Sequence, residues 1–91
     1  MSRVALVTGG SRGIGLAIAR RLVCDGLTVC IVDINEKALA RLDEPGDGTE
    51  GRLEWRRASV LDRGEMERVM DDLVRRHGRL DVLVNNAGMT P

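Results

Sequence analysis

The sequence has no tyrosine and no phenylalanine, and it has one tryptophan, two prolines and two cysteines among 91 residues. Cys24 and Cys30 lack metal-ligand spacing, so we predict small apolar fillers and favour a reducing, cytoplasmic setting. No apolar run approaches the roughly 20 residues of a membrane helix. Because residues 1–3 lead directly into an apolar strand pattern, no signal peptide is expected.

Charge of either sign is not in excess. Fourteen basic residues balance fourteen acidic ones, and the pairs Arg56-Arg57 and Arg75-Arg76 are more typical of solvated faces than of a nucleic-acid surface. The length allows one small domain with marginal stability. We therefore expect a single domain, with no second domain, no nucleic-acid partner and no membrane partner.

Apolar runs alternate with helical patterns along the whole chain. We predict strands at residues 3–8, 28–33, 53–58 and 80–85, and helices at 13–25, 35–42 and 62–77. Asn35 and Asp62 are expected to cap their helices, and Gly26 and His77-Gly78 to end theirs. The βαβαβαβ pattern predicts an α/β fold with a parallel sheet and helices on both faces.

Other features of the elements lead to more local predictions. Residues 43–51 read as a surface loop, and the charged strand at 53–58 suits a sheet edge. Trp55 is expected to pack on the sheet and His77 to lie at the surface. Two apolar faces are predicted at helical spacing, formed by Ile14, Ala17, Ile18 and Leu22 in the helix at 13–25 and by Met66, Val69, Met70, Leu73 and Val74 in the helix at 62–77.

The stretch from Val4 to Gly15 reads VALVTGGSRGIG and predicts a strand, a tight turn and a helix N-terminus. Such a turn suits a pyrophosphate, because unpaired N–H groups and the helix dipole favour negative charge there. Glycine allows close backbone approach and positive φ. The alternative interpretation is an ordinary glycine-rich turn between a strand and a helix.

Two motifs in this order resemble those of the short-chain dehydrogenase/reductase family. The residues from Thr8 to Gly15, TGGSRGIG, resemble the family's cofactor motif, and Asn85-Asn86-Ala87-Gly88 resembles its second motif. The resemblance covers the chain but only about the first third of a typical member. It implies a partial Rossmann-like sheet with strand order 3-2-1-4 and a dinucleotide cofactor.

The resemblance assigns roles to residues of the first motif. It implies that Gly9 forms the turn, that Gly13 lets the backbone approach the phosphates, and that Gly15 lets the helix sit close to the sheet. Ile14 would pack beneath the cofactor. Polar contacts to ribose and phosphate would come from Ser11 and Arg12.

Asp33 ends a predicted strand eighteen residues after Gly15. An acid about 20 residues after the motif accepts hydrogen bonds from the adenosine ribose hydroxyls, which favours NAD over NADP. Its charge would also repel a 2′-phosphate. Arg12 instead favours NADP, because a basic residue in that loop often accompanies NADP in the family. Asp33 could alternatively be a turn or capping acid.

Further cofactor contacts follow from the resemblance alone. Ser59 and Val60 lie at the positions where members of the family contact the edge of the adenine. An acid or an amide is common at the position of Ser59, so serine is a departure from the family pattern. In the second motif, Asn86, Ala87 and Gly88 would border the cofactor. Asn86 could equally be a structural amide that ties its strand to neighbouring ones, and both roles can hold.

No catalytic residue is assigned. The family uses a tyrosine with a lysine four residues on, but this sequence has no tyrosine and its only lysine is Lys37. A hydride-transfer enzyme needs a proton donor at the carbonyl. Three hypotheses remain: the NAD-binding portion of an oxidoreductase, a non-catalytic NAD-binding module, or a fragment that pairs with another chain.

The inferred strand order predicts a self-association surface. The strand at 80–85 would be the outer strand, and Val82, Leu83 and Val84 would lie on an unpaired edge with only Asp81 as a guarding charge. Exposed apolar edges favour pairing with another chain. We therefore expect self-association or a complementing chain at this edge.

Overall fold

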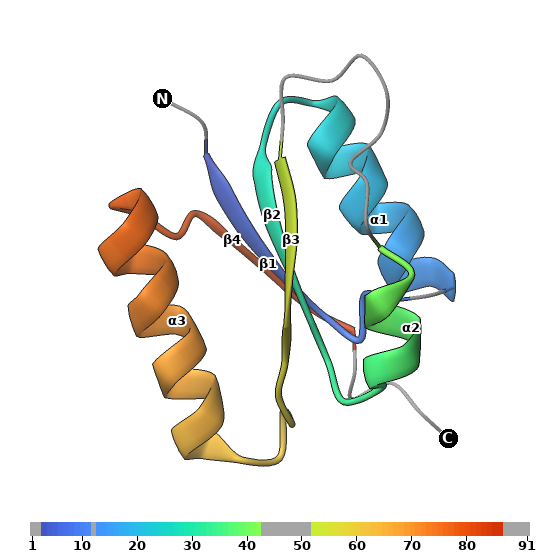
Figure 1. Cartoon of the computed structure of the whole chain (residues 1–91). Coiled ribbons are helices and arrows are strands. Elements are labelled where there is room, and N and C mark those ends of the chain that lie inside the picture. Colours follow the sequence, from blue (N-terminus) through green and yellow to red (C-terminus); the bar gives the residue numbers. More distant parts are fainter. Residues whose placement is uncertain (1–2, 12, 43–51, 87–91) are drawn as a thin grey trace.

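The structure of the chain is a computed structural model that describes residues 3–11, 13–42 and 52–86. Four parallel strands form one sheet in the order β3-β2-β1-β4, namely β1 (Val4–Thr8), β2 (Thr28–Asp33), β3 (Arg52–Arg57) and β4 (Val82–Asn85). Helices α1 (Gly13–Cys24) and α2 (Glu36–Ala40) cover one face, and α3 (Arg63–His77) covers the other (Figure 1). The predicted α/β class, strand order and edge position of β3 are confirmed.

β1 is one of the two inner strands of the described sheet. Leu6 pairs with Cys30 of β2 on one side and with Leu83 of β4 on the other. All five residues of β1 are buried, as expected for a strand with neighbours at both edges and helices on both faces. Its uninterrupted apolar sequence is explained by this position.

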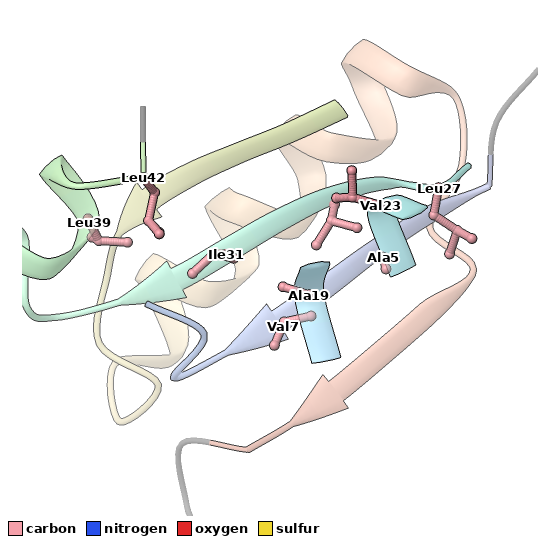
Figure 2. Packing of buried hydrophobic residues seen from close by; sticks show 9 residues of the cluster. Ala5, Val7, Ala19, Val23, Leu27, Ile31, Leu39 and Leu42 are labelled. Carbon is pink, nitrogen blue, oxygen red and sulfur yellow. The ribbon is translucent and has the colours of Figure 1, made fainter. Parts of the chain in front are cut away.

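Alternate residues of the strands supply two separate cores. The core beneath α1 and α2 is shown in Figure 2 and consists of Ala5, Val7, Ala19, Val23, Leu27, Val29, Ile31, Leu39 and Leu42. The core beneath α3 consists of Leu6, Cys30, Val32, Ala58, Met66 and Leu73. The predicted apolar face of α3 is largely confirmed, although Val74 is 46% exposed.

The apolar face predicted for the first helix is only partly right: Leu22 packs against the core, and Ile18 is half-buried. Its buried residues are Gly15, Ala19 and Val23, whereas Ile14 is 75% exposed and Ala17 is also exposed. Gly15 must approach the backbone of the preceding turn, so the row of residues at four-residue spacing from Gly15 faces the sheet. Ile14, one position earlier, is rotated away from the core.

The helix caps agree with the sequence. The Asn35 side chain accepts a 3.0 Å hydrogen bond from Ala38 N, and the Asp62 side chain accepts one of 3.0 Å from Glu65 N. The Glu65 carboxylate accepts from Ser59 N at 2.9 Å, so it binds the turn before the cap. The loop predicted at 43–51 lies outside the described residues.

The side chains of Cys24 and His77 differ from the sequence predictions, and Trp55 is partly exposed. Cys24 is exposed, so it is not an apolar filler, whereas Cys30 is buried as expected. Trp55 lies beside Ile31 in the sheet register but remains 37% exposed. The His77 side chain is only 16% exposed because it packs at Glu54.

Charged side chains join the edge strand β3 to α3. Arg76 donates hydrogen bonds to Glu54 at 2.5 Å and to Asp72 at 2.8 Å. Arg56 forms an ion pair with Asp72, and His77 Nε2 lies 3.4 Å from Glu54 Oε2. Because Glu54 is mostly covered, with a side chain 14% exposed, this network fastens the helix to the edge of the sheet.

Within residues 3–11, 13–42 and 52–86, none of the helices has the length and apolar character to cross a membrane.

Candidate dinucleotide-binding site

The candidate site lies at the carboxyl ends of β1, β2 and β4. These strands end at Thr8, Asp33 and Asn85, and their register places the three ends at one edge of the sheet. In open parallel sheets, ligands bind beyond the carboxyl ends of the strands, where the strand order reverses. Here the order reverses at β1, from which the chain continues to β2 on one side and returns as β4 on the other.

The turn after β1 has the backbone that the glycine motif predicts. Gly9 has a φ of 65° and Gly13 has a φ of 62°. Residues other than glycine rarely adopt this region of backbone conformation. Gly9 N donates to Val32 O at 2.7 Å, which joins the turn to β2. A Cβ at Gly13 would meet no atom of the described residues within 4 Å. These residues therefore leave space beside the first position of α1.

Gly15 is the residue where the turn and α1 touch most closely. A Cβ at this position would overlap the carbonyl oxygen of Gly9, and it would lie 2.7 Å from Asn86 Nδ2 and 3.0 Å from Gly10 Cα. Real Cβ atoms essentially never show the first contact, and the atom met is backbone, which cannot swing away. Only glycine fits here without moving the turn.

The second motif binds the first through hydrogen bonds. Asn86 Nδ2 donates to Gly9 O at 3.1 Å, and Asn86 N donates to Thr8 Oγ1 at 3.0 Å. Thr8 Oγ1 in turn lies 3.2 Å from Asn85 Oδ1. The structural role considered for Asn86 is therefore present. The two motifs, 77 positions apart at Gly9 and Asn86, form one unit.

Asp33 is held by the glycine-rich turn. Its Oδ2 accepts hydrogen bonds from Ser11 Oγ at 2.5 Å and from Ser11 N at 3.4 Å, and its Oδ1 accepts from Asn35 N at 3.1 Å. Desolvation raises the pKa of Asp33, but the hydrogen bonds from Ser11 and Asn35 outweigh it and hold the pKa below its usual value. Asp33 is therefore an ionised hydrogen-bond acceptor at neutral pH.

The other described residues that were predicted to contact the cofactor differ in exposure and in hydrogen bonding. Ile14 is exposed beside the open start of α1. Ser59 and Val60 are half-buried, and Ser59 Oγ accepts from Leu61 N at 3.1 Å, so its hydroxyl oxygen already serves the turn before α3. Arg12, Ala87 and Gly88 lie outside the described residues.

A hollow of about 490 Å³ adjoins the site between α1 and α2. Ser11 and Asn35 line it where it approaches Asp33, and Arg20, Lys37 and Arg41 bring three cationic side chains to its wall. None of these three cations was predicted from the sequence to contact the cofactor. Lys37 and Arg41 lie four positions apart, which places them on one helix face. This spacing is a sequence signal that could have indicated a basic side of the hollow.

Comparison with known proteins identifies the family to which the chain belongs. The protein-family model described as short chain dehydrogenase matches residues 3–91. The chain belongs to this family. The predicted resemblance is therefore confirmed over nearly the whole sequence.

Curated relatives agree with this assignment. The chain is 38% identical over 88 residues to a 3-oxoacyl-acyl-carrier-protein reductase of Thermotoga maritima, with 97% of this chain and 36% of the relative covered. It is 43% identical over 90 residues to a granaticin polyketide synthase ketoacyl reductase of Streptomyces violaceoruber, with 96% and 34% covered. The chain thus spans about a third of the length of these relatives.

Solved structures share the fold. A short chain dehydrogenase from Mycobacterium smegmatis superposes with a TM-score of 0.82 at 38% identity, with 93% of this chain and 36% of that chain covered. A variant of actinorhodin polyketide ketoreductase, solved with NADPH, gives a TM-score of 0.82 at 44% identity, with 93% and 33% covered. The sheet and helices described above are thus those of a short-chain dehydrogenase.

Proposed function

We propose that this chain is the dinucleotide-binding N-terminal portion of a short-chain dehydrogenase/reductase-type oxidoreductase. The observation that carries the proposal is the close contact of Gly15 with the Gly9 carbonyl, held by Asn86. Among the described residues, nothing lies within 4 Å of a Cβ placed at Gly13, so the backbone at the start of α1 is unobstructed there. Unpaired N–H groups at such a helix start suit a pyrophosphate. The bound cofactor would supply hydride chemistry between a carbonyl and an alcohol.

NAD is the cofactor that Asp33 favours. An ionised carboxylate accepts hydrogen bonds from ribose hydroxyls and repels a 2′-phosphate. The lowered pKa of Asp33 keeps the carboxylate ionised throughout the physiological range. The other proposed cofactor contacts are those that the family resemblance names, at Gly9, Ser11, Arg12, Gly13, Ile14, Gly15, Ser59, Val60, Asn86, Ala87 and Gly88.

One observation favours NADP as the second candidate. Arg20, Lys37 and Arg41 wall the hollow next to Ser11 and Asn35, and cationic side chains attract phosphate. A structural relative was also solved with NADPH. The choice between NAD and NADP therefore depends on which interaction at the ribose is stronger, that of the Asp33 carboxylate or that of the three cationic side chains.

Titration calorimetry of the chain with NAD and NADP tests both statements. We expect NAD to bind more tightly than NADP. Asp33→Ala should reduce this difference in affinity, because it removes a hydrogen-bond acceptor for the ribose and a charge that repels the 2′-phosphate. Tighter binding of NADP by the unmodified chain would reverse the assignment. Absence of binding to either cofactor would refute the dinucleotide site.

The chain by itself is proposed to be inactive. The sequence has no tyrosine, so the proton donor that this family uses is not supplied. We expect reduced-nicotinamide absorbance to stay constant across carbonyl substrates. Turnover abolished by one substitution in this chain would show that another proton donor exists. The alternatives are a non-catalytic NAD-binding module and a fragment that complements another chain.

The setting and partners follow from the same proposal. We propose a cytoplasmic location, because the sequence has only two cysteines and they lack metal-ligand spacing, a usage that fits a reducing compartment. The 91 residues would form a single, incomplete domain without a second one. We further propose self-association, or pairing with a complementing chain, at the edge of β4, where Leu83 is 55% exposed.

A further inference from the structure

The outer backbone groups of β3 face away from the described sheet. Ala58 N donates to Asp33 O of β2 at 3.2 Å, in a register that pairs Arg57 with Asp33. Successive residues of a strand direct their backbone groups to opposite edges, so those of Leu53, Trp55 and Arg57 point away from β2. Because β3 is the last strand on this side of the described sheet, these N–H and C=O groups are available to another strand.

The side chains of β3 alternate between the two faces of the sheet. Trp55 lies on the face covered by α1 and α2, since its register partner Ile31 belongs to the core there. Glu54 and Arg56 lie on the opposite face, where ion pairs join them to α3. In Figure 1, β3 runs between α3 on one side and α1 with α2 on the other. A strand at this edge would therefore meet an acid and a base on one face and an aromatic ring on the other.

This alternation limits how β3 of a second copy could pair with the edge. Two identical strands related by a two-fold axis run antiparallel, and a register centred between two residues would set outward groups against inward ones. Of the remaining registers, those centred on Glu54 and on Trp55 pair the most of β3 (Arg52–Arg57). The first places Glu54 opposite Glu54 of the second copy, and like charges directly opposite are destabilising. The second places Glu54 opposite Arg56, and the symmetry makes this favourable pair occur twice.

We propose that β3 pairs antiparallel with β3 of a second copy of this chain, across a two-fold axis at Trp55. Backbone hydrogen bonds then join Trp55 to its counterpart and Leu53 to Arg57 of the second copy. Glu54 and Arg56 meet in the positions between these hydrogen-bonded pairs, where opposite side chains lie closest. The two Trp55 rings lie opposite each other, and aromatic pairs add stability beyond the area that they bury.

Charge makes this edge selective for its own copy. Charged side chains on an edge strand oppose pairing with most other strands, but the order Glu54, Trp55, Arg56 is complementary to itself when reversed. Arg76 holds Glu54 at 2.5 Å and Asp72 pairs with Arg56, so both charges are already positioned and lose little freedom on association. A single short strand buries less surface than a standard interface, and the dimer should therefore be weak and depend on concentration.

Disulfide cross-linking tests the register, in a background of Cys24→Ser and Leu83→Lys that removes the exposed cysteine and weakens association at β4. Trp55→Cys in this background should form a covalent dimer on mild oxidation, because Cα atoms of a hydrogen-bonded antiparallel pair lie about 5.5 Å apart, within the range of a disulfide. Arg57→Cys alone is the matched control and should stay monomeric, since it faces Leu53 of the second copy. A mixture of Arg57→Cys and Leu53→Cys should cross-link one chain to the other.

Sedimentation tests the backbone pairing in the same background with Trp55 intact. Arg57→Pro removes an N–H that points outward, so it should leave the β2 pairing in place, as a proline on an edge strand can. Relative to Arg57→Ala, it should raise the dimer dissociation constant about tenfold or more, because each of the two chains loses a hydrogen bond. If Arg57→Pro fails to fold, the pattern of cross-links decides alone.

Three results would overturn the proposal. A background chain that stays monomeric at every concentration would show that β3 does not bind its own copy. Cross-linking of Arg57→Cys alone, as efficient as that of Trp55→Cys, would show a different register. Equal dimerisation of folded Arg57→Pro and Arg57→Ala would show that the copies meet at another surface.

Discussion

The side-chain amide of Asn86 donates a 3.1 Å hydrogen bond to the carbonyl oxygen of Gly9. The same nitrogen would lie 2.7 Å from a Cβ at Gly15. Three backbone segments, from the ends of β1 and β4 and the start of α1, therefore meet at one point. Four expectations concern this contact, the neighbouring carboxylate, the network on α3 and the edge of the sheet.

Gly15→Ala should destabilise the fold and abolish cofactor binding. The added Cβ overlaps the Gly9 carbonyl, and forced overpacking costs about 1–3 kcal/mol. Gly64→Ala is the matched control, because a Cβ there meets Asp62 Oδ1 only at 3.4 Å, an ordinary contact. Removing a helical glycine should stabilise by about 0.5–1 kcal/mol. Denaturant unfolding measures both, and equal stability of the two variants would contradict the packing argument.

Asp33 should make stability fall at acidic pH. Its pKa is below the usual value in the folded chain because hydrogen bonds from Ser11 and Asn35 outweigh desolvation. The stabilisation is therefore fully present above the unfolded pKa of about 3.9 and is lost as the pH falls through the folded pKa. Unfolding free energies measured from pH 7 to pH 3 should show a shallower decline in Asp33→Asn than in the unmodified chain.

Asp25→Asn provides the comparison for that measurement. Asp25 is half exposed and pairs only loosely, at 3.4 Å, with the mostly exposed Arg21. This variant should follow the unmodified chain closely at every pH. A decline as shallow as that of Asp33→Asn would show that the pH dependence does not come from the Ser11 contact.

Two adjacent arginines of α3 should differ in their effect on stability. Arg76 is 32% exposed and bridges Glu54 and Asp72, whereas Arg75 is 78% exposed and, among the described residues, pairs only with Asp72. Arg76→Gln should cost about 1–3 kcal/mol, because it removes a partner of a mostly covered carboxylate. Arg75→Gln should change stability by about 0.5 kcal/mol or less. Equal losses in thermal unfolding would contradict the bridging role.

The edge of β4 should control self-association. Leu83 is 55% exposed on this strand, and Asp81 beside it is engaged by Val4 N at 2.8 Å and by Arg79. We expect Leu83→Lys to reduce association in sedimentation experiments, because charge on an edge strand opposes pairing. Leu61→Lys is the control, since Leu61 is 93% exposed in a turn and not on a strand. A monodisperse unmodified chain would refute the edge proposal.

Much of the fold could be predicted from particular residues. The apolar alternation with helical segments predicted the sheet and its covering helices, and Asn35 and Asp62 cap where local chemistry places them. These features depend on short stretches of sequence. The strand order needed the resemblance, since periodicity does not state which strands are neighbours.

The errors arose where a residue serves something other than the core. Ile14 fits a helical apolar stripe, but Gly15 sets the rotation of α1 and turns Ile14 outward. The hydrogen bonds of Ser11 to Asp33 join residues 22 positions apart, and no local pattern encodes them.

The position of β1 between β2 and β4 has a consequence for synthesis. Val4 to Thr8 can pair with β2 after about thirty residues are made, but the other edge of β1 waits for Val82 to Asn85. During elongation at about 5–20 residues per second, that edge stays open for seconds. A nascent chain therefore passes through a stage with its most apolar strand half paired, when chaperone capture competes with closure of the sheet.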